Sequence, residues 1–182
     1  SQDSEAVVID TPGSNTPLSR LAHSRADTLV TPINDSFVDL DLLAKIDPDT
    51  LDVVGPSIYA EMVWEQRKLR MLRERIAVDW LVVRNRVSST DTRNKRNMEQ
   101  VLEKLAKRIG FRIAPGFGDR VIFREMFLSG LTLLDMRDAG IKLSLSHVAA
   151  RQEVRDLLAA LTAPPTASAA TALRPDGSKA DA

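Results

Sequence analysis

Short apolar runs rich in β-branched residues alternate with longer segments of helical periodicity along most of this chain. The runs cover residues 6–9, 27–33, 80–83 and 111–114, and a fifth run, 131–134, is a candidate edge strand. These runs lack a regular apolar–polar alternation, so each is expected to be buried on both faces. Strands of this kind belong to parallel sheets that helices cover on both sides. The sequence therefore predicts an α/β fold with a doubly wound, mostly parallel sheet.

Helices are predicted between these runs. Their ranges are 16–25, 37–44, 57–76, 89–109, 118–128 and 145–162, and residues 47–56 are expected to form a loop. The clearest helix is 89–109, which ends at Gly110 and carries one apolar stripe, made of Met98, Val101, Leu102, Leu105 and Ile109.

The helix predicted at 57–76 has a second apolar stripe, made of Ile58, Met62, Leu69, Leu72 and Ile76. Residues at this spacing share one side of a helix, the side expected to face the core. Glu65 falls on the same side, and we therefore expect it to have a basic partner.

The length of 182 residues suggests one domain, residues 1–162, and a tail, residues 163–182. The tail is rich in Ala, Pro, Thr and Ser, a composition that predicts disorder. The chain has no cysteine, which excludes a disulfide framework, a thiolate metal site and a cysteine nucleophile. No apolar stretch is long enough for a membrane-spanning helix, and no signal peptide is visible. The expected location is the cytoplasm.

Charge is segregated along the chain although the net charge is zero. Residues 1–65 carry 3 basic and 12 acidic side chains, residues 66–124 carry 16 and 6, and residues 125–182 carry 6 and 7. A basic central third suggests an anionic partner such as nucleic acid or an acidic membrane. A basic face paired with the protein's own acidic residues explains the same numbers.

In doubly wound sheets, ligands bind at the carboxyl ends of the strands, so the residues that follow each run are informative. The first run ends at Asp10, and Gly13 follows three residues later. A carboxylate at a strand tip can hold the water shell of Mg²⁺, and glycine lets the next peptide approach a γ-phosphate. The alternative is a strand-to-helix turn in which Asp10 caps the helix.

Asn85 follows the third run, between Arg84 and Arg86. Its carboxamide can both donate to and accept from a purine edge, or it can cap the following loop. No acidic residue stands three positions later, which favours adenine over guanine. Pro115 and Gly116 form a turn after the fourth run.

Basic residues cluster on the 89–109 helix opposite its apolar stripe and in nearby segments. They are Arg93, Arg96, Lys104, Lys107 and Arg108, with Arg84, Arg86, Arg112, Arg120 and Arg124 close in sequence. Such a surface suits non-specific binding to phosphates. Aromatic residues are only 4% of the chain, which disfavours stacking on single strands. His23 and His147 are isolated, and the sequence contains neither GxSxG nor HExxH.

Several blocks resemble one protein family. Six blocks carry the resemblance: VVIDTPGSNTPLSRLAHSRADTLVTPINDSFVDLDLL, PSIYAEMVWEQRK, VDWLVVRNRVSSTDTRNKR, LAKRIGFRIAPGFGDRVIFREMF, GLTLLD and LSHVAARQEVRDLL. Together they are similar to the MipZ-type division-plane positioning ATPases. These belong to the ParA/MinD group of P-loop ATPases. The resemblance covers roughly residues 6–162 and implies a sheet of that P-loop type.

The resemblance also implies site residues. Asp10 resembles the Walker B aspartate, which holds Mg²⁺ through water, and Gly13 the switch II glycine, both of them catalytic positions. Nucleotide contacts are implied for Asn85, Arg86, Pro115 and Gly116, and DNA contacts for Arg93, Arg96, Arg112 and Arg120. Asn97 departs from the family pattern, which has a basic residue there, and this suggests weaker DNA binding.

The family's phosphate-binding loop, KGGxGKS/T, is expected before Asp10, and the sequence before Asp10 does not contain it. We therefore interpret the chain as the C-terminal portion of such an ATPase domain, with a sheet that is incomplete at its N-terminal side. Because the two lysines of that loop are missing, we expect the chain alone to bind ATP poorly and to be inactive as an ATPase.

The function implied by the resemblance is an ATP- and Mg²⁺-dependent switch. Its ATP-bound homodimer binds double-stranded DNA non-specifically, is recruited by ParB and inhibits FtsZ assembly, in a cytoplasmic, nucleoid-associated location. One alternative is a ParA-type ATPase that partitions chromosomes or cargo. Another is a DNA-binding or dimerisation module that works without nucleotide.

Overall fold

The computed structural model describes residues 6–47, 50, 52–88, 93–136, 138–140 and 144–163. Its elements, in chain order, are α1 (Pro17–Arg25), β1 (Thr28–Asn34), α2 (Phe37–Leu40), β2 (Ala44–Ile46), β3 (Val53–Pro56), α3 (Ile58–Glu74), β4 (Asp79–Asn85), α4 (Arg93–Leu105), the π-helical turn η1 (Ala106–Gly110), β5 (Arg112–Ala114), α5 (Val121–Leu128) and α6 (Leu145–Thr162).

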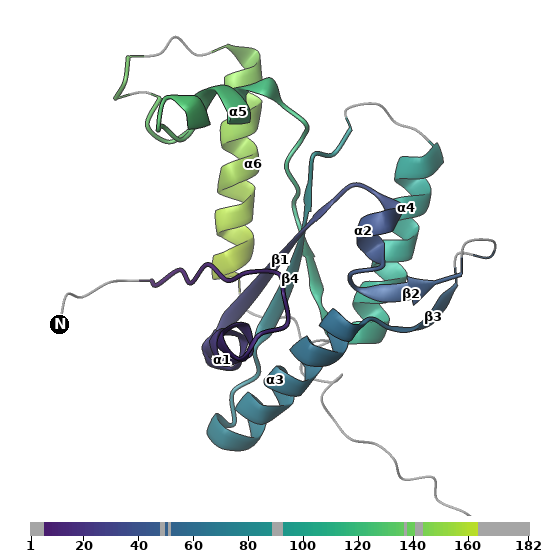
Figure 1. The fold of residues 1–182 in the computed structure, drawn as a ribbon. Helices are drawn as coiled ribbons and strands as arrows, with labels where there is room; N and C mark the ends of the chain where they lie inside the picture. Colours follow the sequence, from purple (N-terminus) through teal and green to yellow (C-terminus); the bar gives the residue numbers. More distant parts are fainter. Residues whose placement is uncertain are drawn as a thin grey trace, which may run out of the picture.

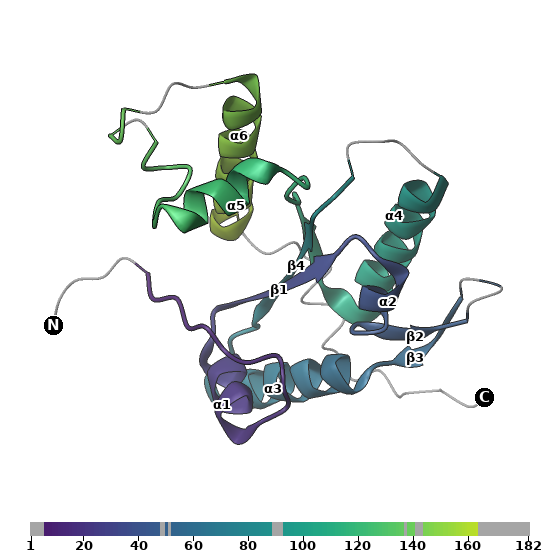
Figure 2. The ribbon, with the colours of Figure 1, turned by 45° about the horizontal axis from the view of Figure 1, so that its top comes forward.

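A parallel sheet in the order β1-β4-β5 organises the fold, and β2 and β3 form a separate antiparallel hairpin (Figure 1). The register runs from Thr28 opposite Asp79 to Asn34 opposite Asn85. At β4, helices cover both faces of the sheet, with α6 on one side and α3 and α4 on the other (Figures 1 and 2), whereas one face of β1 is exposed at Val30, Pro32 and Asn34. The predicted α/β class with a parallel, helix-flanked sheet is confirmed.

The central strand β4 divides the core into two layers because its side chains alternate between the faces. Trp80 and Val82 pack with α3 and α4, whereas Leu81 and Val83 pack with Leu157 and other residues of α6. Six of the seven residues of β4 are buried, as the apolar run WLVV predicts. The stripe of the 89–109 helix is confirmed too, since Met98, Val101, Leu102 and Leu105 are buried and Ile109 packs against them.

The strand predicted at residues 6–9 is wrong. Val7, Val8 and Ile9 lie in an irregular segment and are exposed, and residues 6–13 join no strand ladder. β-Branched side chains favour a strand only where a neighbouring strand and a packing surface are present. Within the described residues β1 pairs with β4 alone, and the segment before α1 does not extend the sheet.

Three other assignments are also wrong. Residues 131–134 form no strand but lead into a turn that begins at Leu133, where the backbone and hydroxyl of Thr132 both donate to the Asp135 carboxylate, at 2.8 and 2.7 Å. Residues 47–56 are not a simple loop, since their second half forms β3 and pairs with β2. The helix predicted at 37–44 is shorter, because α2 ends at Leu40. The predicted tail lies outside the described residues beyond Ala163.

The apolar stripe predicted to face the core on α3 is exposed, apart from Met62. The buried side of α3 is mixed: Gln66, Arg67 and Arg70 are buried together with the apolar residues Ala60, Met62 and Val63. Arg67 donates to the Val78 and Gly110 carbonyls, at 3.2 and 2.8 Å, and Arg70 donates to the Arg25 carbonyl and to Asp27. These hydrogen bonds permit charged side chains to be buried, so part of the buried side of the helix is polar.

His23 of α1 gives the fold a pH dependence. Its ring is 7% exposed and lies edge-on to Tyr59, with centroids 6.1 Å apart, and its Nδ1 has no hydrogen-bond partner in the described structure. Burial lowers the pKa of His23 below 6.5. The unfolded chain therefore takes up a proton that the folded chain resists, and the free energy of unfolding falls as pH drops below about 6.5.

We expect His23→Gln to flatten this dependence. Urea unfolding of the wild type at pH 7.0 and 5.5 should show lower stability at pH 5.5, and the variant should show a smaller difference between the two values. An unchanged difference in the variant would assign the pH dependence to other groups.

Candidate functional site

The carboxyl ends of β1, β4 and β5 meet at one edge of the sheet, and Arg84 ties them together. Its guanidinium donates through Nε to the Asp35 carboxylate after β1, at 3.0 Å, and through Nη1 to Glu99 of α4, at 2.9 Å. Burial lowers the pKa of Arg84, but the hydrogen bonds to the two carboxylates outweigh it and the net shift is upward. The Arg84 side chain therefore stays charged and joins Asp35 to Glu99 at this edge.

The Pro115–Gly116 turn lies directly against β4. The Phe117 N–H donates to the Arg84 carbonyl, at 2.8 Å, and a Cβ added at Gly116 would stand 2.5 Å from that oxygen. Only glycine permits this approach without moving backbone. A cavity of about 410 Å³ opens between the turn and α4, lined by Arg84, Ser88, Lys95, Glu99, Pro115 and Gly116 among others.

Asn85 and Arg86 lie next to the residues that line this cavity. The Asn85 side chain is exposed and its Oδ1 accepts the Arg86 backbone N–H, at 3.0 Å, which is the loop-capping role left open above. Its carboxamide N–H₂ group points to no partner in the described hydrogen bonds. Arg86 has a left-handed backbone, φ 56°, and its guanidinium lies 4.0 Å from Asp119. The structure thus gathers the four predicted nucleotide-binding residues at one edge.

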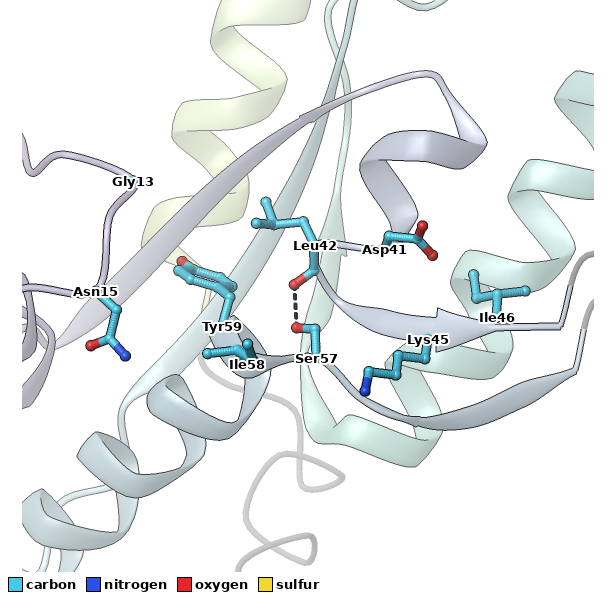
Figure 3. A pocket seen from close by; sticks show the side chains of 9 residues that line it. All are labelled: Gly13, Asn15, Asp41, Leu42, Lys45, Ile46, Ser57, Ile58 and Tyr59. Carbon is cyan, nitrogen blue, oxygen red and sulfur yellow. Dashed lines mark hydrogen bonds between the residues drawn. The ribbon is translucent and has the colours of Figure 1, made fainter.

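Asp10 and Gly13 lie elsewhere. Asp10 is exposed in the irregular segment before α1, so it does not stand at the tip of a strand. Gly13 and Asn15 line a different cavity, of about 620 Å³, whose other walls come from the β2–β3 hairpin and the start of α3, including Leu42, Ser57 and Tyr59 (Figure 3). The two cavities share no lining residue.

These positions differ in how well they suit Mg²⁺ and the separate parts of ATP. Among the described residues no group of three or more acidic or histidine side chains is placed to hold a metal ion. Asp10 alone fits only an ion whose other ligands are water and phosphate. The edge with Asn85 and Gly116 fits the base of a nucleotide, whereas a phosphate cradle of the P-loop kind is missing from the sequence before Asp10.

The four predicted DNA-binding arginines fall into two groups. Arg93 and Arg96 lie exposed at the start of α4. Arg112 instead donates to both carboxylate oxygens of Asp79 and to the Ala160 carbonyl, and Arg120 donates to Glu153, at 2.8 and 3.0 Å. The hydrogen bond to each carboxylate raises the pKa of Arg112 and of Arg120. Both side chains brace α6, because Ala160 and Glu153 belong to that helix.

The acidic partners Asp35, Glu99 and Glu153 are not among the site residues predicted from the sequence. The position of Asp35 could be predicted from the sequence. Asp35 comes after one predicted strand and Arg84 after the neighbouring one, so parallel pairing of the two strands brings both residues to the same edge of the sheet. The positions of Glu99 and Glu153 could not, because their contacts depend on how α4 and α6 dock. The expected basic partner of Glu65 is confirmed as Arg20, at 3.2 Å.

Comparisons with known proteins support the resemblance. The sequence model of the family described as ATPase MipZ matches residues 1–165, which is most of the chain. A search of curated proteins gives no match. Within the part of the chain that the structure describes, no helix combines the length and apolar character needed to cross a membrane. The match over residues 1–165 places this chain in the MipZ family of ATPases.

Proposed function

We propose that this chain supplies the base-binding edge and a DNA-binding helix to an ATP-dependent switch in division-site positioning. The observation that carries the proposal is the convergence of Asn85, Pro115 and Gly116 beside α4. The helix that walls the cavity with Lys95 and Glu99 also exposes Arg93 and Arg96. A base bound at this edge lies next to the helix that would meet DNA.

The phosphate end of the nucleotide needs residues that this edge lacks. We infer that a segment carrying the family's KGGxGKS/T loop pairs with the open side of β1 and brings Asp10 and Gly13 to the phosphates. Two observations support this inference. Val30 of β1 is partly exposed, and the described residues pair β1 on one side only. Val7, Val8 and Ile9 have exposed apolar side chains, and such a segment would provide strands with which residues 6–9 could pair.

Binding of DNA is proposed for α4 and not for the arginines that brace α6. Phosphate contacts by exposed Arg and Lys side chains give non-specific affinity that falls steeply with salt. Dimer formation with ATP, recruitment by ParB, inhibition of FtsZ and association with the nucleoid are proposed from the family. An ATPase that partitions chromosomes or cargo remains the alternative within it.

A DNA-binding or dimerisation module that works without nucleotide is the second candidate. The position of Asp10 favours it, because Asp10 is exposed in the irregular segment before α1 and does not stand at the end of a strand in the described sheet. The two candidates differ in one respect. The switch gains DNA affinity when the nucleotide site is complete, and the module binds DNA equally with and without nucleotide.

We expect Arg93→Ala with Arg96→Ala to weaken binding to a labelled DNA duplex about tenfold or more at low salt. The slope of log affinity against log salt should fall by about 2, one for each lost phosphate contact. Fluorescence anisotropy in a salt series measures both. Arg124→Ala with Arg155→Ala removes the same charge from exposed sites on α5 and α6 and serves as the control.

The same titration separates the two candidates. The chain is measured alone, with ATP and Mg²⁺, and with a separately expressed segment that carries the KGGxGKS/T loop. For a switch, affinity rises only when the segment, ATP and Mg²⁺ are all present. Equal affinity in every mixture supports the module, and equal loss in the control variant contradicts the assignment of α4.

A further inference from the structure

An exposed apolar stripe runs along the outer side of α3. Leu69 and Leu72 follow the spacing i, i+3, so they share one side of the helix, and Ile76 follows directly after the left-handed C-cap residue Arg75. Their side chains are 52%, 63% and 46% exposed. The opposite side of α3 is the one that packs on the sheet through Val63, Arg67 and other buried residues. The helix is therefore apolar on a side that no described element covers.

Helix α1 packs beside α3 and carries an exposed leucine of its own. Figures 1 and 2 both show α1 beside α3. Arg20 of α1 pairs with Glu65, and Arg73 of α3 donates to the Ser24 carbonyl, at 2.9 Å. Leu21 lies between these two contacts in the α1 sequence and is 54% exposed. We call Leu21, Leu69, Leu72 and Ile76 the α1–α3 stripe.

Basic residues border the α1–α3 stripe on both sides. Lys68 lies exposed on the side of α3 away from α1, Arg75 is exposed at the C-cap of α3, and Arg20, Arg25 and Arg73 lie on the side toward α1. Acidic residues offset only part of this charge. Glu65 holds Arg20, Glu74 is shared by Arg25, Arg70 and Arg73, and Glu61 is exposed one turn before Glu65. The border of the stripe is thus net positive.

We propose that the α1–α3 stripe is a docking surface for an acidic amphipathic helix of another protein. An amphipathic helix binds an apolar surface of this shape through side chains at i, i+3 and i+7. Acidic residues on its flanks would meet Lys68, Arg73 and Arg75, which gives the pairing its orientation and raises its association rate. This surface lies on other elements than the proposed nucleotide and DNA sites.

Two other occupants fit less well. A second copy of this chain would place the same basic border against itself, and like charges brought together oppose association. An anionic membrane would have to accept Glu65, whose position between Ile58 and Leu69 puts a carboxylate inside the apolar side. A docked helix with acidic flanks can end before it reaches Glu65, so that the Glu65 carboxylate stays in solvent.

The test uses a fluorescein-labelled helical peptide of about 18 residues, with Leu at i, i+3, i+7 and i+10 and Glu at the flanking positions. A second probe replaces every Glu with Lys. We expect the acidic probe to bind the wild-type chain, and the Lys probe to bind about tenfold or more weakly. Leu69→Ser with Leu72→Ser should weaken the acidic probe about tenfold or more, because the centre of such a contact carries most of the affinity.

Val121→Ser with Leu128→Ser removes similar exposed side chains from α5 and should leave probe binding unchanged. All four substituted side chains are more than half exposed, so both double variants should keep the wild-type thermal midpoint. Equal binding of the two probes, or no binding of either, overturns the proposal. Two further results also overturn it. One is a dimer in analytical ultracentrifugation that Leu69→Ser with Leu72→Ser dissociates and the α5 variant does not. The other is flotation of the chain with phosphatidylserine vesicles that Leu69→Ser with Leu72→Ser abolishes.

Discussion

Arg67→Ala is expected to lower the free energy of unfolding by about 3–5 kcal/mol. Arg67 is 1% exposed, and its guanidinium donates to the carbonyls of Val78 and Gly110. It also lies 6.0 Å from the centre of the Trp80 ring. Burial lowers the pKa of Arg67, and the nearby Asp79 charge raises it in part. Removing the side chain leaves two buried carbonyls without donors and a cavity between α3 and β4.

Urea unfolding measures this loss, and two further variants separate its causes. Arg67→Met fills most of the volume but donates no hydrogen bond, so it should recover only part of the stability. Lys68→Ala, at the next and exposed position of α3, should change stability by no more than about 0.5 kcal/mol. A loss below about 1 kcal/mol for Arg67→Ala would mean that water replaces the guanidinium and that the two carbonyls keep partners.

The case of α3 explains which parts of the fold the sequence predicts. The buried side of α4 and the run Trp80 to Val83 of β4 are apolar, so the sequence pattern identifies them correctly. The buried side of α3 contains Arg67 and Arg70, whose donors reach carbonyls from segments distant in sequence. Periodicity counts these residues as polar and assigns them to solvent. The predicted side of α3 is therefore wrong because hydrogen-bond partners at long range are invisible in the sequence.

The candidate site divides in the same way. Asn85, Pro115 and Gly116 follow strands that form, and parallel strands bring their carboxyl ends to one edge, so the sequence predicts this group. Asp10 follows residues 6–9, which pair with no described strand. Its predicted place at a strand tip requires a neighbouring strand, and the described residues contain none beside this segment. The roles of Arg112 and Arg120 depend on the docking of α6, which no local pattern encodes.

Arg112→Ala is expected to release the C-terminal end of α6 from the sheet and to lower the free energy of unfolding by about 3 kcal/mol. Arg112 neutralises Asp79, which is buried in β4, and donates to the Ala160 carbonyl in the last turn of α6, at 3.0 Å. A cation near the carbonyl end of a helix also stabilises the helix dipole. Without Arg112 the Asp79 carboxylate stays buried and unpaired. Limited proteolysis should then cut α6 near Leu157 and Leu161, which pack on β4 and β5.

Asp79→Asn distinguishes this bracing role from the DNA contact that the family resemblance implies for Arg112. If Arg112 braces α6, the loss of its carboxylate partner weakens the docking of α6, so protease sensitivity rises as it does in Arg112→Ala. If Arg112 contacts phosphate, Asp79→Asn removes a competing anion, so affinity for duplex DNA rises while Arg112→Ala lowers it. We expect rising protease sensitivity in both variants and, in Asp79→Asn, no gain in DNA affinity at low salt. A gain would return Arg112 to the DNA-binding surface beside Arg93, because a guanidinium held by Asp79 in the free protein would then be available to phosphate.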